Sequence, residues 1–443
     1  MSTDQYTEDA VSALSSTIID KAPYFGSLPL PAPAFELFFK DKNGQAHSVN
    51  LASAATEQLS ALAEACSVAP FGRGAESVVD DTYRKAGKLD LPNFAIPFQP
   101  EGTALGAGIR ECVLGGAESK RPVRFELYKL NVYGEGDFFK AHKDTPRGGA
   151  MFGSLVLVYP TVHSGGALAF RHRGQEWTFD SASAVYQDGS PALGYAAFYS
   201  DVEHEVLPVT SGYRVTITYN LYFDDAKVAQ PASGPFVSDF ANRLQNLLDD
   251  PHFMPQGGYL GFGLRHAYPI EFSEEFTFVR NGVQHIASVL KGSDAAVLRA
   301  AQAAGLSTRL HVAYDCKIYN SGRGYPRERT VTVLARKVVG GDYVEGGMWE
   351  LLKEEQYGGV TLWPKGDDKC RVERTVHWVT PRTGASRVKS VVMAYGNEAS
   401  LDYKYSELCL LVAVGKAGAR TAKKNLVQDE KDRKYHVYGA DSY

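Results

Sequence analysis

The sequence predicts a mainly β fold, α+β when the whole chain is considered, and three observations lead to this class. Strand-like segments alternate with turn residues between residues 125 and 223, a pattern typical of an all-β sandwich or barrel. Helical and strand-like periodicities are mixed from residue 236 onward, which indicates a separate α+β domain. The length of 443 residues also exceeds what one hydrophobic core usually supports.

Composition along the chain predicts where the two domains begin and end. Residues 1–33 end in a Pro-rich run and are expected to be partly disordered, and residues 34–228 are expected to form the mainly β domain. Pro, Gly and Ser are frequent in residues 229–235, which indicates a linker. Residues 236–415 would then form the α+β domain, and residues 416–443, charged and poor in apolar side chains, a tail.

The mainly β domain is expected to begin with a strand at Phe35. Ala and Leu recur at helical spacing from Ser53 to Cys66, where Ser53 would cap the helix, and a second helix is expected from Leu105 to Leu114. These helices would brace the outer face of the β structure. Five strands follow, at residues 125–133, 154–159, 167–171, 196–199 and 213–223.

The α+β domain is expected to open with an amphipathic helix. Apolar side chains recur there every four residues, at Phe236, Phe240, Leu244 and Leu248. A second helix is predicted from Ser293 to Ala304, because Ser stands at its start and Gly305 just past its end. The strands expected in this domain lie at residues 310–318, 331–339, 375–379, 390–394 and 408–414.

Charge, cysteine content and hydropathy favour an intracellular protein that binds neither nucleic acid nor membranes. A formal net charge of −4 and a pI near 6.3 give no basic footprint for DNA or RNA. The five cysteines are dispersed and include no Cys-x-x-Cys pair, as expected of free thiols in the cytoplasm or nucleus. Asp4 stands where a signal peptide has basic residues, and no run of about 18 apolar residues suggests a membrane span.

Three side chains could close on one metal ion. His142 and Asp144 are two residues apart, so on an extended segment both point to the same face. His204 precedes a β-rich segment and would supply a second imidazole if that segment folds back. Two imidazoles and one carboxylate leave about three positions of an octahedral ion open, the arrangement of non-heme Fe(II) oxygenases. A structural zinc site would favour four closed ligands instead.

Arg214 lies at a position that fits such a site. Residues 206–218 read as a hairpin, in which a three-residue loop with Gly212 in the left-handed conformation puts Arg214 opposite Pro208. His204 and Arg214 would then share a face, about 13 Å apart. A five-carbon diacid spans that gap, and the planar guanidinium of Arg binds a carboxylate through two hydrogen bonds. Thr216 would share the same inward face.

The segments that contain these four residues resemble those of a known enzyme family. Residues 133–144, the Gly-Gly-x-Leu-x-Phe segment 165–170, and residues 204–220 resemble the prolyl 4-hydroxylase-type branch of the 2-oxoglutarate/Fe(II)-dependent dioxygenases. The resemblance covers about residues 121 to 225 and includes the ligand spacing and the Gly-Tyr-Arg-Val-Thr strand in the family's order. Phe139 departs from the Tyr of some peptidyl prolyl hydroxylases, which weakens any expectation of one particular peptide substrate.

The resemblance implies a double-stranded β-helix, or jelly roll, that holds a catalytic site. It assigns His142, Asp144 and His204 as the metal ligands and Arg214 as the residue that binds the distal carboxylate of 2-oxoglutarate, with Tyr133 and Thr216 assisting. Aromatic residues and Thr are also ordinary strand formers, so core packing remains the alternative for Tyr133 and Thr216. His163 and His172 are left outside the site as loop and strand-end histidines.

The activity implied by the resemblance is an oxidation that uses Fe(II), 2-oxoglutarate and O2, with ascorbate as an additional candidate reductant. An unactivated C–H bond of a peptidyl residue, an amino acid or a small metabolite would be oxidised, usually to an alcohol, with release of succinate and CO2. The alternative is a non-catalytic jelly-roll module that binds a protein or peptide and has a structural or vestigial metal site. By analogy with two-domain relatives, the C-terminal domain could be a degenerate second jelly roll.

Overall fold

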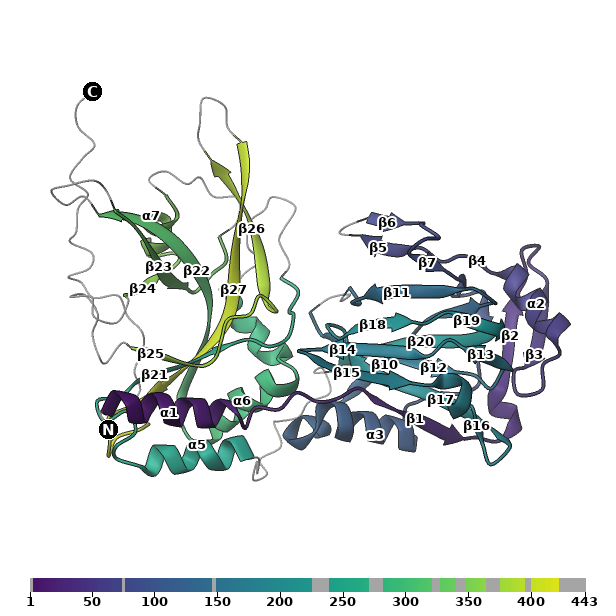
Figure 1. Cartoon of the computed structure of the whole chain (residues 1–443), viewed down its shortest axis with the longest axis horizontal. Coiled ribbons are helices and arrows are strands. Elements are labelled where there is room, and N and C mark those ends of the chain that lie inside the picture. Colours follow the sequence, from purple (N-terminus) through teal and green to yellow (C-terminus); the bar gives the residue numbers. More distant parts are fainter. Residues whose placement is uncertain are drawn as a thin grey trace. The chain divides into compact units, whose positions relative to one another are not determined.

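The structure, a computed structural model, divides into two compact units. One unit, here called the β unit, comprises Lys21–Gly234, and the other, the α+β unit, comprises Met1–Asp20 together with Pro235–Tyr443 (Figure 1). The division lies within the predicted linker 229–235, which itself falls outside the described residues. The described residues are 3–73, 76–145, 149–224, 239–270, 282–320, 327–339, 347–363, 375–394 and 400–421.

The β unit contains two principal sheets. The larger has the order β1 (Tyr24–Pro29), β17 (Ser190–Tyr199), β12 (Met151–Val158), β20 (Arg214–Phe223), β10 (Val123–Tyr133), β8 (Gly87–Asp90) and β4 (Ser67–Val68), with β16 (Tyr186–Gln187) paired to β17. The smaller has the order β15 (Gln175–Phe179), β14 (Leu168–His172), β18 (Glu203–Val206), β11 (Phe138–His142) and β7 (Arg84–Lys85). Together they form the jelly roll that was predicted.

Shorter elements complete the β unit. These are a three-stranded sheet of β3 (Ala46–Asn50), β2 (Glu36–Lys40) and β9 (Phe94–Ala95), the pair β5 (Phe71–Arg73) and β6 (Glu76–Val78), and the pair β13 (His163–Gly165) and β19 (Val209–Gly212). The helices are α2 (Thr56–Ala65), α3 (Ala104–Ile109), continued by a π-helical turn at Arg110–Leu114, and α4 (Ser181–Ala184). The helix predicted to start at Ser53 begins at Thr56, because the Gln58 side chain accepts the Ala55 N–H there.

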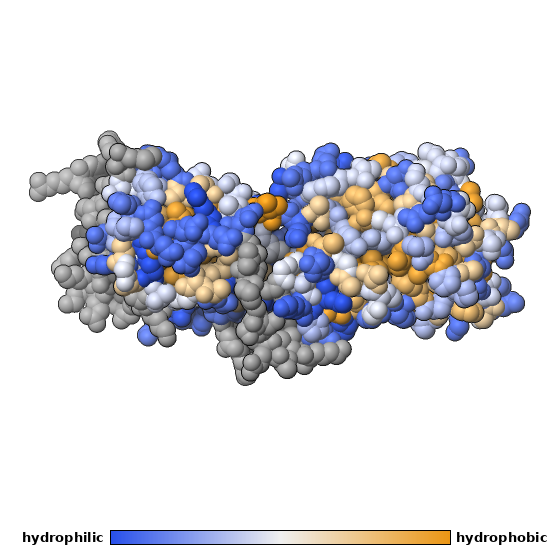
Figure 2. Space-filling view, turned by 90° about the horizontal axis from the view of Figure 1, so that it is seen from below, coloured by the Kyte–Doolittle hydropathy of each residue, from blue (hydrophilic) through white to orange (hydrophobic). Residues whose placement is uncertain are grey.

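The larger sheet has one apolar face and one largely polar face. On β20, Val215, Ile217 and Leu221 are buried on the side that packs against the helices and loops of the unit. The hydroxyl of Tyr219, on the same side, donates to the carbonyl of Phe98. Seen from the side of α3, hydrophilic and hydrophobic side chains are interspersed over the surface of the β unit (Figure 2). Because side chains alternate along a strand, Arg214, Thr216 and Asn220 of β20 point to the opposite face, where they line the cavity of the β unit.

The predicted hairpin between Val206 and Arg214 is wrong. β18 belongs to the smaller sheet and β20 to the larger one, and the connecting strand β19 pairs with β13. Gly212 does have the predicted left-handed conformation, at φ 72°. A Cβ on Gly212 would lie 2.2 Å from the carbonyl oxygen of Val162, so the chain needs glycine where it crosses between the two sheets.

The α+β unit contains one seven-stranded sheet within the described residues. Its order is β24 (Val360–Leu362), β23 (Arg327–Ala335), β22 (Ser307–Asn320), β27 (Ser400–Val414), β21 (Gly258–Gly263) and β25 (Val376–Thr380), with β26 (Arg387–Ala394) paired to β27. The helices are α1 (Thr3–Ser15), α5 (Asp239–Asp249), α6 (Gly292–Ala303) and α7 (Met348–Lys353), with a 3-10 helix at Gly282–Val289. A jelly roll needs two facing sheets, whereas apolar side chains of α1, α5 and α6 cover this sheet instead.

Both chain ends differ from the sequence prediction. Residues 3–33, expected to be partly disordered, contain α1 and β1, because Val11 and Leu14 of α1 are buried in the core of the α+β unit and β1 pairs with β17. The tail expected from residue 416 is fixed as far as Thr421 by hydrogen bonds of Arg420, and its remainder lies outside the described residues. No described helix is long and apolar enough to cross a membrane.

Candidate active site

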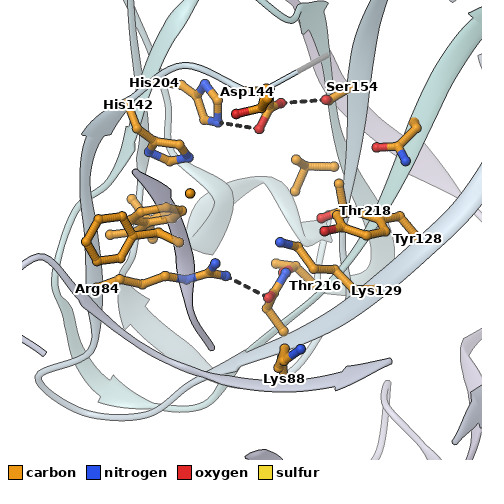
Figure 3. A pocket seen from close by; sticks show the side chains of 18 of the residues that line it. Arg84, Lys88, Tyr128, Lys129, His142, Asp144, Ser154, His204, Thr216 and Thr218 are labelled. Carbon is orange, nitrogen blue, oxygen red and sulfur yellow. Dashed lines mark hydrogen bonds and ion pairs between the residues drawn. The ribbon is translucent and has the colours of Figure 1, made fainter. Parts of the chain in front are cut away.

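The structure brings His142, Asp144 and His204 together inside the β unit (Figure 3). His142 ends β11 and is paired in register with His204 on β18, while Asp144 follows directly after β11. One ligand atom of each residue lies within 4.8 Å of the others. Strand register therefore brings the two imidazoles together, with ring centroids 4.2 Å apart and planes tilted by 53°, and the carboxylate approaches them from the adjoining loop.

Both imidazoles are held with one nitrogen available to a metal. The Nδ1 of His142 lies 2.8 Å from the carbonyl of Lys140, and the Nδ1 of His204 lies 3.1 Å from the carbonyl of Val202. A carbonyl only accepts, so each Nδ1 carries the proton and each Nε2 keeps its lone pair, the state that binds metal. Burial lowers the pKa of His142 to about 3, which keeps this ring neutral.

The third member of the group is an ionised carboxylate. Asp144 Oδ1 lies 3.8 Å from His204 Nε2, and Asp144 Oδ2 accepts a hydrogen bond of 2.5 Å from the hydroxyl of Ser154 on β12. Burial acts to raise the pKa of Asp144, but His204 and Ser154 outweigh it and the net shift is downward. Two neutral imidazoles and one carboxylate suit a divalent ion with about three open positions.

Arg214 provides a buried cation in the same cavity. Its side chain is 1% exposed and its Nε donates to the hydroxyl of Ser181 at 3.2 Å. Its Nη2 is buried and has no hydrogen-bond partner among the described residues. Burial lowers the pKa of Arg214 to about 10, so the guanidinium stays charged at neutral pH. An unsatisfied buried donor is costly, and a ligand carboxylate would satisfy it.

The Gly-Gly pair of the sequence motif makes room for this arginine. Gly166 has φ 69°, and a Cβ there would lie 2.6 Å from Arg214 Cδ. The carbonyl of Gly166 accepts from the hydroxyl of Ser181, the same hydroxyl that binds Arg214. The motif therefore fixes the guanidinium both by leaving space and through a shared serine.

Tyr133 and Thr216 lie on the inward face of the larger sheet. Tyr133 of β10 is paired in register with Arg214, and its ring centroid lies 5.4 Å from the guanidinium carbon. Thr216 follows Arg214 by two residues on β20 and faces Asn131 of β10. Both line the cavity that contains Arg214 and the His142–Asp144–His204 group, and its volume is about 620 Å³.

Three contributors to this cavity were not predicted. Ser154 of β12 and Arg84 of β7 line it, and Ser181 of α4 contributes through its hydrogen bond to Arg214. A serine or arginine in these segments carries no spacing signal of its own, because its partner is distant in sequence. Figure 3 shows Arg84 and Ser154 on different sides of the cavity.

Comparison with known proteins identifies the domain. Residues 128–222 match the family model described as the 2OG-Fe(II) oxygenase superfamily. The chain contains a 2-oxoglutarate/Fe(II) oxygenase domain. The matched residues include His142, Asp144, His204 and Arg214, and the match supports a 2-oxoglutarate-dependent dioxygenase, as the sequence resemblance implied.

Solved structures similar to the oxygenase domain include prolyl hydroxylases. A Pseudomonas putida prolyl-4-hydroxylase is 19% identical over 48% of this chain and 98% of its own, with a TM-score of 0.28. A Trichoplax adhaerens prolyl hydroxylase in complex with a hypoxia inducible factor peptide fragment is 16% identical over 50% of this chain and 92% of its own, with a TM-score of 0.25. No curated protein matches the chain.

Proposed function

We propose that the oxygenase domain hydroxylates a C–H bond, with His142, Asp144 and His204 holding Fe(II) and Arg214 binding the distal carboxylate of 2-oxoglutarate. One observation carries the proposal: three residues that could hold a metal line the same cavity as a buried guanidinium, whose Nη2 has no hydrogen-bond partner among the described residues. The triad donors are the kinds that Fe(II) oxygenases use. Tyr133 and Thr216 flank Arg214 and would contact the diacid beside it.

Each residue of the proposed site would have a different role in binding or orientation. When bound, Fe(II), 2-oxoglutarate and O2 supply the oxidising chemistry, and the diacid leaves as succinate and CO2. Arg214 would orient the diacid along β20 toward the triad, because Ser181 fixes its Nε and leaves Nη2 for the ligand. The carbonyls of Lys140 and Val202 would keep both imidazoles in the metal-binding tautomer, and Ser154 would orient the carboxylate of Asp144.

The substrate would be a peptidyl residue, an amino acid or a small metabolite. A cavity of about 620 Å³ that also holds a metal and a five-carbon diacid leaves space for one side chain or one small molecule.

The cysteines in the described residues, Cys66, Cys112, Cys316 and Cys409, are free thiols. Free thiols support an intracellular location, cytoplasmic or nuclear.

The proposal is tested by separating metal binding from diacid binding. In anaerobic titrations, His142→Ala and Asp144→Ala should each weaken Fe(II) binding by more than about a hundredfold, because loss of even an outer partner of a metal ligand costs 10- to 100-fold. Arg214→Ala should keep Fe(II) and lose the diacid, because the carboxylate loses its charged partner. Full activity in Asp144→Ala would refute the assignment.

The alternative of a non-catalytic module makes a different prediction. A vestigial or structural metal site would neither bind 2-oxoglutarate nor convert it to succinate, with or without added substrate. Incubation of the wild-type chain with Fe(II), O2 and 2-oxoglutarate, followed by measurement of succinate, distinguishes the two. Formation of succinate by the wild type but not by Asp144→Ala supports the oxygenase. A wild type that neither binds nor converts 2-oxoglutarate supports the module.

A further inference from the structure

The cavity contains a second buried guanidinium, Arg84, that the triad and the diacid do not use. Arg84 lies on β7 and is 3% exposed. Its Nη1 donates to the carbonyl of Pro70 at 2.7 Å and its Nη2 to Asn131 Oδ1 at 2.8 Å. Its Nε is buried without a hydrogen-bond partner, and it has no acidic partner among the described residues. Of the five N–H donors of this guanidinium, two therefore have a hydrogen-bond partner within the described part of the chain.

A stack of rings connects Arg84 to the metal-binding group. The guanidinium carbon lies 4.3 Å from the ring centroid of Phe139, and that ring lies 3.5 Å, centroid to centroid, from the imidazole of His142. Three layers thus join β7 to the triad. Arg84 and the triad line the same cavity, so a molecule bound at Arg84 would extend toward the residues that would hold the metal. Arg84 is therefore placed to hold what is oxidised, whereas Arg214 lies among the residues around the diacid.

Two lysines extend the positive charge around Arg84. In the register of β8 and β10, Lys88 is paired with Asn131, the partner of Arg84, and Lys129 is paired with Asp90. Figure 3 shows the side chains of Arg84, Lys88 and Lys129 on the side of the cavity away from Ser154. Asp90 is bound by the ammonium of Lys88 at 2.5 Å.

The charges that line the cavity do not balance once metal and diacid are assigned. Asp144 would neutralise part of the metal charge, and Arg214 would pair with the diacid. The remaining charged lining residues are one acid, Asp90, and four bases, Arg84, Lys88, Lys129 and Lys143. A cavity with this excess attracts anions and disfavours cations, and the effect is strongest at a buried site such as Arg84.

We propose that Arg84, flanked by Lys88 and Lys129, binds a carboxylate of the substrate, so that the oxidised molecule is an acid. The inference rests on the proposed function, whose substrate it narrows to free acids and acidic peptidyl side chains. The planar guanidinium, with Nε–H and two further N–H groups unused, matches the two oxygens of a carboxylate. A neutral substrate would leave these donors unsatisfied in the cavity, which costs binding energy.

Matched acid and amide probes test this inference on the full chain. The protein is loaded with Mn(II) and N-oxalylglycine, an inert analogue of 2-oxoglutarate that occupies Arg214. One arm compares N-acetyl amides of Asp and Glu with those of Asn and Gln, and the other compares free N-acetyl amino acids with their amides. Binding is measured from the broadening of probe NMR signals by Mn(II), which reports closeness to the metal. The two arms distinguish a side-chain carboxylate from a free one.

The acid of at least one arm should bind at least about tenfold more tightly than its amide, because a charge-assisted hydrogen bond is lost in the amide. Arg84→Gln should remove most of this preference, and the double variant Lys88→Gln/Lys129→Gln should reduce it. Lys42→Gln removes one positive charge from an exposed turn outside the cavity and should change nothing. Equal binding of acid and amide, or an unchanged preference in Arg84→Gln, overturns the inference.

Two readouts separate failure of this inference from other failures. If Arg84→Gln misfolds and loses Mn(II), the test uses the double variant Lys88→Gln/Lys129→Gln instead. An unchanged preference for acid over amide in that double variant overturns the inference. Absence of Mn(II) and N-oxalylglycine binding in the wild type would overturn the proposed function and the inference with it. Normal metal and analogue binding without acid preference overturns the inference alone.

Discussion

At the scale of single residues, the proposed diacid pocket depends on how one guanidinium is kept in place with no acidic partner among the described residues. Among the described residues, the Arg214 guanidinium has one hydrogen bond, to the neutral hydroxyl of Ser181, and this hydroxyl also donates to the carbonyl of Gly166. Gly166 has no side chain where a Cβ would meet Arg214 Cδ at 2.6 Å. The position of the charge is therefore set by the space beside Gly166 as much as by hydrogen bonding.

Gly166→Ala should weaken 2-oxoglutarate binding by about tenfold or more while Fe(II) affinity is retained. The added methyl group displaces the buried Arg214 side chain, so the carboxylate loses part of its charge-assisted hydrogen bonding. Alanine at φ 69° also costs about 1–2 kcal/mol of folding free energy. Titration of the variant with Fe(II), and then with 2-oxoglutarate, measures the two affinities separately.

Gly174→Ala is the matched control for that variant. Gly174 has φ 78°, so alanine meets the same backbone strain there, but a Cβ at this position has no heavy atom within 4 Å. Its stability should fall by a similar amount and its affinity for 2-oxoglutarate should not change. Equal diacid affinities in the two variants would show that displacement of Arg214 is not the cause.

The sequence predicted the site residues that follow a spacing rule and missed those that do not. His142 and Asp144 are separated by two residues, and the registers of β11 with β18 and of β10 with β20 place His204 and Arg214 around the same cavity. Ser154 contacts Asp144 and Ser181 contacts Arg214 only after distant segments have paired. The same holds for Arg84, which packs on the ring of Phe139. No local pattern marks such side chains, because any exposed serine or arginine looks the same in the sequence.

At the scale of elements, an irregularity in β12 helps to set the metal-binding group. The register between β12 and β20 shifts between Met151 and Gly153, so that Ser154 lies opposite Asn220 on the inward face. From there Ser154 donates to Asp144. A β-bulge of this kind re-aims side chains near a functional site, and here the re-aimed side chain supports a proposed metal ligand.

Gly153→Ala should lower both stability and Fe(II) affinity. Its Cβ would lie 2.3 Å from the carbonyl oxygen of Phe198 on the neighbouring strand β17, and two paired backbones cannot separate without loss. We expect a loss of about 1–3 kcal/mol in the free energy of unfolding. Displacement of Ser154 should weaken Fe(II) by about tenfold. Urea denaturation and an Fe(II) titration measure the two effects.

Gly149→Ala provides the control for the strand. A Cβ on Gly149 has no heavy atom within 4 Å, so the same substitution four residues earlier should change neither stability nor metal binding. Normal Fe(II) affinity in Gly153→Ala would mean that the bulge does not position Ser154.

Periodicity predicted the elements well, but turn residues did not predict how the strands pair. The five strands expected between residues 125 and 223 are present as β10, β12, β14, β17 and β20. The hairpin expected around Gly212 fails, because a glycine in the left-handed conformation fits a crossing between two sheets as well as a tight turn. Only the register of each strand with its neighbours distinguishes the two cases.

At the scale of the whole molecule, each unit has its own hydrophobic core, and the chain order does not follow the units simply. Helix α1 packs with α5 and α6 in the core of the α+β unit, whereas β1, a few residues later, pairs with β17 in the β unit. The two units divide between Gly234 and Pro235, and the first helix belongs to the unit that lies C-terminal to this division, which the sequence did not predict. An apolar helix face shows that a partner exists without showing which core supplies it.

Arg420→Ala should destabilise the α+β unit without changing the oxygenase site. The Arg420 guanidinium donates to the carbonyls of Leu248, Asp250, Phe253 and Met254, and so fixes the segment after β27 to the end of α5. Loss of these charge-assisted hydrogen bonds should cost about 2–4 kcal/mol. Lys416→Ala, an exposed position in the same segment, should change stability by less than about 0.5 kcal/mol. Calorimetry of both variants, with Fe(II) titration alongside, tests the prediction, which fails if Arg420→Ala unfolds like the wild type or loses Fe(II).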